Sequence, residues 1–393
     1  MKPRKIKDGI YWVGAVDWDR RMFDCLIPLP DGTSYNAYLV QGSKKTALID
    51  TVDPSMSHIL HGRLTQLGVE HIDYVIANHA EQDHTGTLPQ ILDRYPQAQV
   101  VCTPKCKKML VDLALSPEDR ILAVEDGKTL ALGGRTLEFI HAPWVHWPET
   151  MLTYLHEDKI LFPCDFLGSH LAASDLYVSD EGQVYEAAKR YYAEIMMPFR
   201  RVIQKHLKRI QEHEISLIAP SHGPIYDRPE FILDAYNEWV FGDPKNIVVL
   251  PHISMHDSTR MMVDHMVDAL IEKGVRVKPF NLAFTDIGEL AMALVDAATI
   301  VIGSPTVLGG AHPNVVYAVY LANALKPKTK FVSIIGSYGW GGKMVKQLAD
   351  LISNLEVEII DPVVIKGYPK DEDFQVLDKL AAAIAVKHEA LNM

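Results

Sequence analysis

The sequence is poor in cysteine: its 393 residues include four, and no two of them form a Cys-x-x-Cys pair. This spacing excludes a zinc knuckle and a rubredoxin-type iron centre. A disulfide framework is not expected in a chain of this length with so few cysteines. We therefore interpret all four as buried or half-buried free thiols. They are Cys25, Cys102, Cys106 and Cys164.

Long apolar runs and an excess of positive charge are missing as well. No uninterrupted apolar stretch is long enough to span a bilayer, and no signal-peptide core follows the basic start at residues 1–5. The formal net charge is −11, and Lys and Arg do not cluster along the chain. We therefore expect a cytoplasmic protein that binds neither membranes nor nucleic acids.

The sequence does have enough apolar material for more than one core. Hydrophobic residues make up 48% and charged residues 23%, which is typical of a globular protein. A length of 393 residues favours two domains. The turn-rich stretch Asp243-Pro244-Lys245-Asn246 separates two different patterns of apolar residues. We predict one domain over residues 1–244 and a second over residues 245–393.

In the first domain, short apolar runs are interrupted by Gly, Asp and Ser, which favours strands. Two groups of strands with helices between them are compatible with two sheets packed face to face and helices outside. The predicted strands include residues 9–14, 36–40, 46–50, 74–77 and 99–102, and helices are expected at about 55–68 and 88–95.

The most informative stretch of the first domain follows the predicted strand 74–77. Its sequence, Asn-His-Ala-Glu-Gln-Asp-His-Thr-Gly, places His79, Glu81, Asp83 and His84 within six residues on a predicted loop. A zinc site would favour nitrogen donors here. The two carboxylates add hard oxygen donors, a mixture that also suits iron or manganese. A polar loop without a metal is the alternative interpretation of this stretch taken alone.

Further candidate ligands follow later apolar runs. His146 comes after the run 137–143, Asp165 after 159–164 and His222 after 216–220. Side chains at such strand ends can converge on one side of a sandwich. Four more residues could approach or line this site: His170, Trp147, Tyr191 and Tyr192. For the three aromatic residues among them other than histidine, packing in the core is the alternative.

This pattern resembles the metallo-β-lactamase superfamily. Glu81 stands where hydrolases of that superfamily carry a second histidine, and this makes the chain similar to one branch, the flavodiiron proteins. The resemblance implies an αββα sandwich that holds a non-haem diiron centre. In some family members the residue matching His84 is not bound to metal. The implied ligands are His79, Glu81 and His146 for one iron, Asp83, His84 and His222 for the other, and Asp165 as the bridge between them.

After residue 244, predicted strands and helices alternate regularly. This alternation predicts an α/β domain with a doubly wound parallel sheet of five strands. The predicted strands are 247–250, 275–278, 299–303, 331–336 and 357–360, and the helices are about 259–273, 287–295, 313–325 and 343–354, with a last helix at the C-terminus.

Three loops of the second domain follow predicted strands and are rich in small and hydroxylated residues. A doubly wound sheet binds its ligand beyond the carboxyl ends of the strands, at the point where the strand order reverses. Backbone amides and hydroxyls at a helix N-terminus can hold a phosphate without a lysine. The motif Gly-x-x-x-x-Gly-Lys-Ser/Thr is missing, which argues against a nucleoside triphosphate. The pattern resembles flavodoxin.

That resemblance implies an FMN site with its phosphate on the first loop and its isoalloxazine between the other two. Asp257 stands where flavodoxin-type loops often carry glycine, so we expect its side chain to point away from the phosphate or to cap the helix. Tyr338 or Trp340 is expected to lie against the isoalloxazine. Ordinary turns without a ligand are the alternative. The predicted contacts are Ser254, Met255, His256, Asp257, Ser258 and Thr259 in the first loop, Ser304, Pro305, Thr306, Val307 and Gly309 in the second, and Ser337, Tyr338, Gly339, Trp340, Gly341 and Gly342 in the third.

The resemblance covers essentially the whole chain and implies a flavodiiron oxidoreductase. Electrons would pass from FMN to the diiron centre, which reduces dioxygen to water, nitric oxide to nitrous oxide, or both. It also implies a head-to-tail homodimer or a dimer of such dimers. No rubredoxin module is present, so the electron donor is expected to be external: rubredoxin, a reduced deazaflavin coenzyme or another flavoprotein.

Two other functions stay open on the sequence. One is a zinc hydrolase of the metallo-β-lactamase superfamily with an attached FMN domain, against which Glu81 counts. The other is a flavodoxin-like electron carrier whose first domain is a scaffold.

Overall fold

The computed structural model describes residues 2–391, which fall into two compact units. The chain passes from the first unit to the second between Val240 and Phe241, and the short segment Ala193–Pro198 is grouped with the second unit. The domain boundary at residues 244 and 245 stays a prediction. None of the helices in the described part of the chain is long and apolar enough to cross a membrane.

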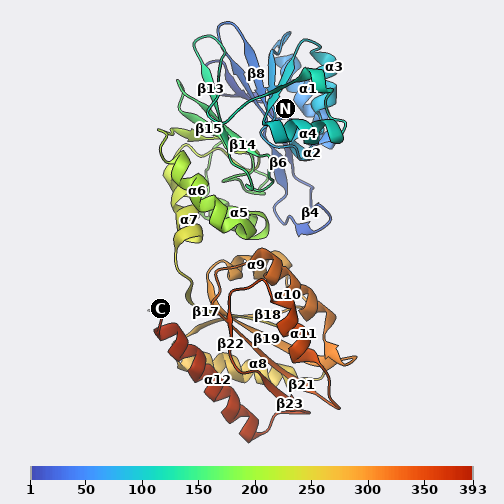
Figure 1. Cartoon of the computed structure of the whole chain (residues 1–393), viewed down its shortest axis with the longest axis vertical. Coiled ribbons are helices and arrows are strands. Elements are labelled where there is room, and N and C mark those ends of the chain that lie inside the picture. The colour runs from blue at the N-terminus through green and yellow to red at the C-terminus, as the bar shows by residue number, and fades with distance from the viewer. Residues whose placement is uncertain (1, 392–393) are drawn as a thin grey trace. The chain divides into compact units, whose positions relative to one another are not determined.

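Two sheets form the centre of the first unit (Figure 1). The first sheet has the strand order β1-β2-β7-β8-β9-β10-β11, and the second has the order β12-β13-β14-β15-β16. The strands of the first sheet are β1 (Arg4–Lys7), β2 (Ile10–Trp12), β7 (Tyr38–Gln41), β8 (Thr46–Ile49), β9 (Tyr74–Ile76), β10 (Gln99–Cys102) and β11 (Ile121–Ala123). Those of the second are β12 (Thr129–Ala131), β13 (Thr136–His141), β14 (Met151–Leu155), β15 (Ile160–Phe162) and β16 (Leu217–Ile218). Two small ribbons pair β3 (Ala15–Asp17) with β6 (Thr33–Tyr35), and β4 (Met22–Phe23) with β5 (Ile27–Pro28).

Apolar side chains pack against both faces of the first sheet. On one face, Leu60, Ile91 and Leu110 belong to helices α1, α3 and α4 and are buried against the strands. On the other face, Tyr38 and Phe139 lie in the core between the two sheets. The result is the αββα arrangement expected from the sequence. The helices of this unit are α1 (Ser57–Gln66), α2 (Gln82–Thr85), α3 (Leu88–Arg94), α4 (Pro104–Asp112), α5 (Glu181–Tyr191), α6 (Arg200–Ile210) and α7 (Pro229–Phe241).

One prediction for the first unit is wrong in detail. Residues 78–86 were expected to be a loop, but they contain the short helix α2, whose first turn follows Glu81 in an extended conformation. The Thr85 hydroxyl donates hydrogen bonds to the carbonyl oxygens of Ala80 and Glu81 and fastens this turn. A helix of four residues is too short to produce a detectable apolar period, so the sequence pattern does not reveal it.

The main path of the sheet in the second unit has five parallel strands in the order β18-β17-β19-β21-β22, and β23 adds a further parallel pairing to β21. Counted along the chain this order is second, first, third, fourth and fifth, which is the predicted flavodoxin-like arrangement. The strands are β17 (Lys245–His252), β18 (Arg276–Asn281), β19 (Ala297–Val307), β21 (Phe331–Tyr338) and β22 (Glu358–Ile359); β20 (Gly310–Ala311) pairs with β19, and β23 (Val363–Lys366) pairs with β21.

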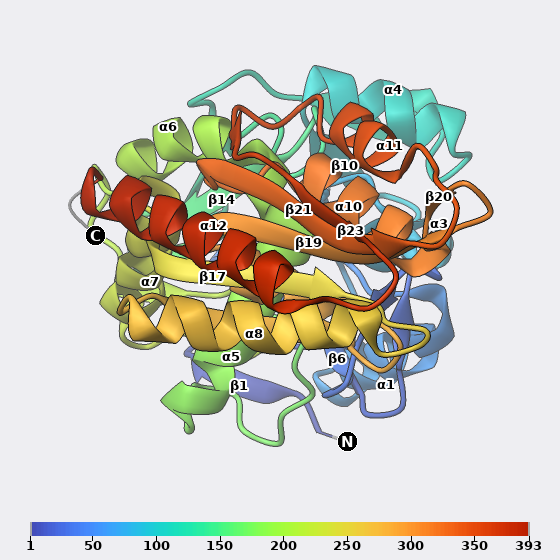
Figure 2. The same cartoon turned by 90° about the horizontal axis from the view of Figure 1, so that it is seen from below.

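Helices cover both faces of this sheet. Figure 2 shows α8 and α12 side by side over one face, where Met266 and Ile384 are buried together with residues of the strands. On the opposite face, Leu290 of α9 and Ala318 of α10 line a small apolar void with Ile300 and Ile302 of β19. The helices are α8 (Ser258–Glu272), α9 (Ile287–Leu294), α10 (Pro313–Leu325), α11 (Met344–Leu351) and α12 (Asp371–Glu389).

Four strands of the second unit, β17, β18, β19 and β21, extend further than the sequence predicts, and two of these extensions take in residues expected in the flavin loops. β19 continues to Val307 and β21 to Tyr338, so residues 304–307 and 337–338, which were predicted to lie in loops, belong to strand ends. The two strands pair with each other here, with Ser304 opposite Gly336 and Pro305 opposite Ser337. This pairing satisfies their backbone groups, so the ladder runs past the apolar segments by which strands are recognised in a sequence.

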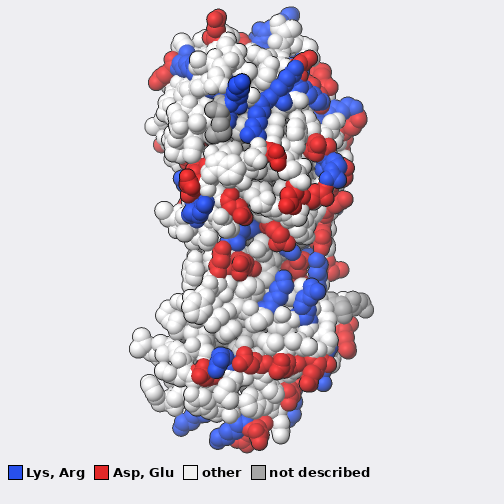
Figure 3. Space-filling view, turned by 180° about the vertical axis from the view of Figure 1, so that it is seen from behind, with Lys and Arg blue, Asp and Glu red and all other residues white. Residues whose placement is uncertain are grey.

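The four cysteines are free thiols, as predicted. Three are buried, but Cys25 is exposed, so the prediction of a buried or half-buried thiol is wrong for this residue. Cys25 has a φ of 53° in the tight connection between β4 and β5, which turns it toward solvent. On the face shown in Figure 3, Lys and Arg side chains are interspersed with Asp and Glu, in keeping with the even charge pattern of the sequence.

Candidate metal centre

The first unit brings together the seven side chains that the sequence pattern singles out. Two groups result, and within each group the candidate ligand atoms lie within 4.8 Å of one another. All seven residues follow strands of the two sheets. The site is therefore positioned by the rigid scaffold and not by a flexible segment. The first group is His79, Glu81, His146 and Asp165, and the second is Asp83, His84 and His222.

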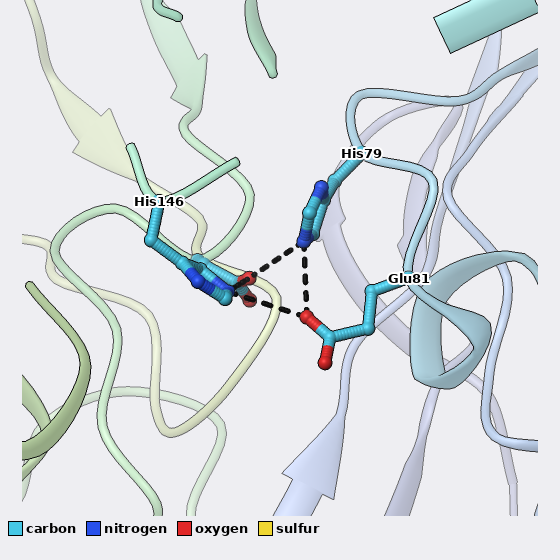
Figure 4. Close-up of side chains that lie close together, drawn as sticks. His79, Glu81 and His146 are labelled. Atoms are coloured by element: carbon cyan, nitrogen blue, oxygen red, sulfur yellow. Dashed lines mark hydrogen bonds and ion pairs between the residues drawn. The ribbon is translucent and has the colours of Figure 1, made fainter. Parts of the chain in front are cut away.

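In the first group, three side chains point toward one another (Figure 4). The Nε2 atom of His79 lies 3.0 Å from Glu81 Oε2, and Nε2 of His146 lies 3.2 Å from the same oxygen. Two imidazole nitrogens and a carboxylate oxygen therefore converge on one small volume. His146 is the most accessible of the three, with 15% of its side chain exposed, so this volume opens to solvent beside His146.

The second group has the same chemistry with different residues. Nε2 of His222 lies 3.1 Å from Asp83 Oδ2, and Nε2 of His84 lies 3.2 Å from Asp83 Oδ1. Here too, two imidazole nitrogens face one carboxylate. All three side chains are almost completely buried.

Asp165 connects the two groups through its two carboxylate oxygens. Oδ2 lies 3.3 Å from His146 Nε2, whereas Oδ1 lies 2.9 Å from His84 Nε2 and 3.3 Å from His222 Nε2. Each oxygen thus faces a different group, which is the arrangement required of a carboxylate that bridges two metal ions.

The donor set fits two cations. Asp83 Oδ1 and Oδ2, His84 Nε2 and Asp165 Oδ1 are buried, and in the described part of the chain these donor atoms face only one another and His222. Buried polar atoms of this kind are costly unless another group satisfies them. Four imidazoles and three carboxylates supply a mixture of nitrogen and oxygen ligands. Such a mixture suits iron, whereas zinc sites are typically rich in nitrogen and sulfur ligands.

The charges of these side chains shift one another's pKa. Burial by itself lowers the pKa of His222, but hydrogen bonds to Asp165 and Asp83 reverse this effect and raise its pKa to about 10. Burial raises the pKa of Asp165, but His84 and the other neighbouring histidines lower it well below its ordinary value. Without a metal the centre therefore holds protons between its imidazoles and carboxylates, and metal binding must displace them.

The segment that carries His222 is fastened by residues 34–36. The Asn36 side-chain amide donates hydrogen bonds of 2.8 and 2.7 Å to the carbonyl oxygens of Pro220 and Gly223. His222 Nδ1 donates to the Ser34 carbonyl oxygen at 2.6 Å, so its Nε2 is left to face the centre. Trp12 Nε1 in turn donates to Asn36 Oδ1 at 2.8 Å, which orients the amide.

Three further residues that the sequence suggested also lie beside the centre. The Trp147 ring is 4.9 Å from that of His79, and the His170 ring is 4.8 Å from that of His222. Tyr191 packs against His170 at 4.8 Å, whereas Tyr192 packs against Tyr236 and Trp239. Of the two tyrosines, Tyr191 is therefore the one that borders the centre.

Sequence reasoning missed several residues around the centre. Ser34 precedes the predicted strand 36–40 and Asn36 begins it, and neither carries a metal-ligand signal. Glu149 was passed over although it stands three positions after His146. Cys164 lies with His84 and Asp165. Burial raises the pKa of the Cys164 thiol well above its ordinary value.

The second unit gathers the predicted FMN residues at the carboxyl end of its sheet. The Ser337 hydroxyl lies 2.8 Å from that of Ser258 and 3.2 Å from that of Thr259, at the N-terminus of α8. Three hydroxyls and the first amides of a helix of this length form a suitable phosphate cradle. Beside it, a cleft of about 610 Å³ is lined by Thr306, Tyr338, Gly341, Gly342, Lys343, Met344, Val345, Lys346 and Val364.

Other predicted FMN residues surround this end of the sheet with different exposure. Ser304 is buried and its hydroxyl accepts from the His312 amide, whereas Trp340 is 98% exposed. Asp257 does not cap α8; its carboxylate pairs with Arg260 Nε at 3.0 Å. Its φ of 64° explains why glycine suits this position, since aspartate is one of the few other residues that adopt such a conformation readily.

Comparison with known proteins agrees with this geometry. Residues 33–223 match the family model described as "ODP family beta lactamase", a segment that contains all seven candidate ligands. The chain is 36% identical to a nitric oxide reductase of Moorella thermoacetica, with 98% of this chain and 99% of that protein covered. The chain belongs to the flavodiiron protein family.

Solved structures show the same relationship over the full length. The structure of rubredoxin oxygen:oxidoreductase from Desulfovibrio gigas superimposes with a TM-score of 0.95 at 29% identity and covers 99% of both chains. A flavodiiron protein from Giardia intestinalis superimposes with a TM-score of 0.89 at 28% identity and covers 99% of this chain and 98% of that one. The fold of this flavodiiron protein therefore combines a β-lactamase-like unit with a flavodoxin-like unit, as the sequence indicated.

Proposed function

We propose that this flavodiiron protein passes electrons from FMN to a non-haem diiron centre that reduces dioxygen to water, nitric oxide to nitrous oxide, or both. The observation that carries this proposal is the position of Asp165 between two groups of matching donors. A hydrolytic zinc site has no need of three carboxylates. The three carboxylates would balance most of the charge of two ferrous ions.

The residues of the centre have distinct parts in this proposal. His79, Glu81 and His146 hold one iron, Asp83, His84 and His222 hold the other, and Asp165 bridges them. Paired metals bind and polarise a small diatomic substrate at two points, which is the chemistry that the irons supply when bound. Trp147 packs against His79, and the ligands other than His146 and Glu81 are almost completely buried, which limits the access of water to the centre.

FMN is proposed to lie at the carboxyl end of the second sheet. Ser258, Thr259 and Ser337 would hold its phosphate, and the cleft beside Tyr338 would accept the isoalloxazine. We also propose that the two functional domains are residues 1–244 and 245–393. Rubredoxin, which the name of the Desulfovibrio protein includes, is the first electron donor to test, followed by a reduced deazaflavin coenzyme and other flavoproteins.

We propose further that the active form is a head-to-tail homodimer or a dimer of such dimers. In it, the flavin of one copy passes electrons to the irons of another. Large apolar side chains next to both sites support this arrangement. Trp144 is half exposed two residues before His146, and Leu308 and Trp340 project into solvent beside the flavin loops. Surfaces of this kind mark sites of protein association.

Metal analysis and anaerobic gas reactions test the function. The protein is purified without added metal and reduced fully, and it is then exposed to each gas in turn. We expect two irons per chain, with water or nitrous oxide as products and reoxidation of the flavin. His146→Asn should abolish gas reduction with FMN still bound, whereas His213→Asn, a histidine outside the centre, should not. Zinc without iron would favour the hydrolase alternative instead, and unchanged gas reduction in His146→Asn would favour a simple flavodoxin-like carrier.

A mixed dimer tests the head-to-tail arrangement. One copy carries His146→Asn and keeps its flavin; the other carries Ser258→Asp, which places a negative charge at the phosphate cradle, and keeps its irons. Each homodimer should be inactive. The mixed dimer should regain activity if electrons pass between copies, and activity that stays absent in the isolated mixed dimer would refute the arrangement.

A further inference from the structure

Glu149 is a buried carboxylate that touches the metal centre from outside its ligand set. Its side chain is fully buried, and Oε1 lies 2.7 Å from His79 Nδ1. The same oxygen accepts a hydrogen bond of 3.0 Å from the Ala80 amide. The Glu149 backbone oxygen accepts from the Thr103 hydroxyl at 2.8 Å, so the residue is held at both ends. His79 therefore donates its Nδ1–H to an anion while Nε2 faces the centre.

The corresponding nitrogens in the second group have no such partner. His222 Nδ1 donates to the Ser34 carbonyl oxygen, which is neutral. His84 Nδ1 is buried and has no hydrogen-bond partner among residues 2–391. Each group has one carboxylate of its own, Glu81 or Asp83, and the two groups share Asp165. Glu149 is thus a carboxylate hydrogen-bonded to a ligand imidazole on the His79 side. The buried Asp50 carboxylate near His84 accepts instead from Asn78 and Ser221.

On the basis of the metal assignment proposed above, we propose that Glu149 makes the two metal positions electronically unequal. It lowers the reduction potential of the iron held by His79. In a pair that has lost one electron, the ferric ion is then the one at His79, and the iron at His84 and His222 stays ferrous.

The physical reason is the charge-assisted hydrogen bond between Glu149 and His79. A carboxylate that accepts the proton of a ligating imidazole draws it toward itself and makes the imidazole a stronger, more anionic donor. A stronger donor favours the higher oxidation state, and the low dielectric of a fully buried site screens the effect little. A carbonyl acceptor such as that of Ser34 polarises the imidazole less because it carries no net charge.

Three substitutions in the flavin-containing protein test the inference. Glu149→Gln keeps the shape and an acceptor for His79 but removes the charge. Glu149→Asp keeps the charge and withdraws it by one methylene group. Glu138→Gln removes the same charge from a carboxylate that pairs with His156 at 2.8 Å, outside the metal centre. The quantity measured is the comproportionation constant of the iron pair, from a redox titration that follows the EPR signal of the one-electron-oxidised pair.

We expect the constant to fall by roughly tenfold in Glu149→Gln, by less in Glu149→Asp, and not at all in Glu138→Gln. Unchanged constants in both Glu149 variants would overturn the inference, as would an equal fall in Glu138→Gln. If Glu149→Gln does not retain two irons, the comparison of Glu149→Asp with Glu138→Gln decides it in the same way. Failure of the proposed function is distinguishable, because the unsubstituted protein would then lack two irons from the start.

Discussion

The Nε2 atom of His84 lies 2.9 Å from Oδ1 of Asp165. The ring is therefore turned toward the centre, with Nε2 facing the same volume as the other donor atoms. This orientation bears on the one ligand whose counterpart in some family members is not bound to metal. His84 has a suitable geometry to bind the second metal in this chain.

His84→Ala should weaken iron binding at the second position by roughly tenfold to a hundredfold, because one donor is lost from a buried site. Iron content after dialysis against a weak chelator measures the effect. His58→Ala, at an exposed histidine of the same unit, is the matched control. Full retention of both irons in His84→Ala would mean that His84 is not a ligand here.

Asn36→Ala should destabilise the first unit by about 2 kcal/mol, because the Gly223 carbonyl oxygen and the Trp12 indole lose their buried partner, whereas the Pro220 carbonyl oxygen keeps the Tyr38 hydroxyl. Iron binding at His222 should weaken with it. Trp12→Phe removes the hydrogen bond to Asn36 Oδ1 and leaves the two that the Asn36 amide donates. Loss of this hydrogen bond should lower the free energy of unfolding by about 1 kcal/mol. Chemical denaturation with parallel metal analysis measures both, and equal losses for the two variants would contradict this account.

Metal binding should release protons, since the pKa of His222 in the metal-free centre is raised to about 10. Below that pH the imidazole is protonated, and a metal can bind only after the proton leaves. Apparent metal affinity should therefore rise with pH through the neutral range. Calorimetric titration of the metal-free protein in buffers of different ionisation enthalpy counts the protons. A binding enthalpy independent of the buffer would contradict the prediction.

Ser337→Ala should weaken FMN binding by roughly tenfold, because the hydroxyl that joins Ser258 and Thr259 at the cradle is lost. Recovery of flavin fluorescence on dilution measures the dissociation constant. Ser333→Ala changes the same strand four positions earlier, where the hydroxyl faces the Asp361 carbonyl oxygen, and it should leave FMN binding unchanged. Equal affinity in the two variants would move the phosphate site elsewhere.

The second unit should lose stability on acidification through His388. Burial lowers the pKa of this histidine, whose ring nitrogens lie 2.7 Å from the Thr299 hydroxyl and 2.8 Å from Asn246 Oδ1. The unfolded chain then binds a proton more readily than the folded chain. The stabilising contribution of the neutral ring is complete above about pH 6.5, and it is lost as the pH falls from there toward the lowered pKa.

Calorimetric melting at neutral pH and at about pH 5 checks this sign. His388→Asn should reduce the acid-induced fall in the melting temperature of the second unit, whereas His58→Asn, an exposed substitution in the first unit, should not. A larger acid sensitivity in His388→Asn would contradict the prediction.

Much of this architecture could be predicted from local sequence signals. β10 and α10 have the expected bounds. An apolar run marks β10 and a proline marks the start of α10, and both signals lie within a few neighbouring residues of the chain. The cluster from His79 to His84 was recognisable for the same reason, because its donors are close together in the chain. The end of β19 was not predicted, because its pairing with β21 determines where the strand ends. The short α2 was not predicted either, because it is a single turn held by the Thr85 hydroxyl.

The sequence by itself determined the donor types, the apolar periods of the two units and the family. The tertiary structure decided which atoms face one another. Asp165 presents one oxygen to each group, Glu149 reaches His79, and Asn36 holds the loop of His222, although these partners lie far apart in the chain. Local pattern cannot reveal such pairs, because the side-chain contacts that orient and tune a buried site form only when distant segments pack together.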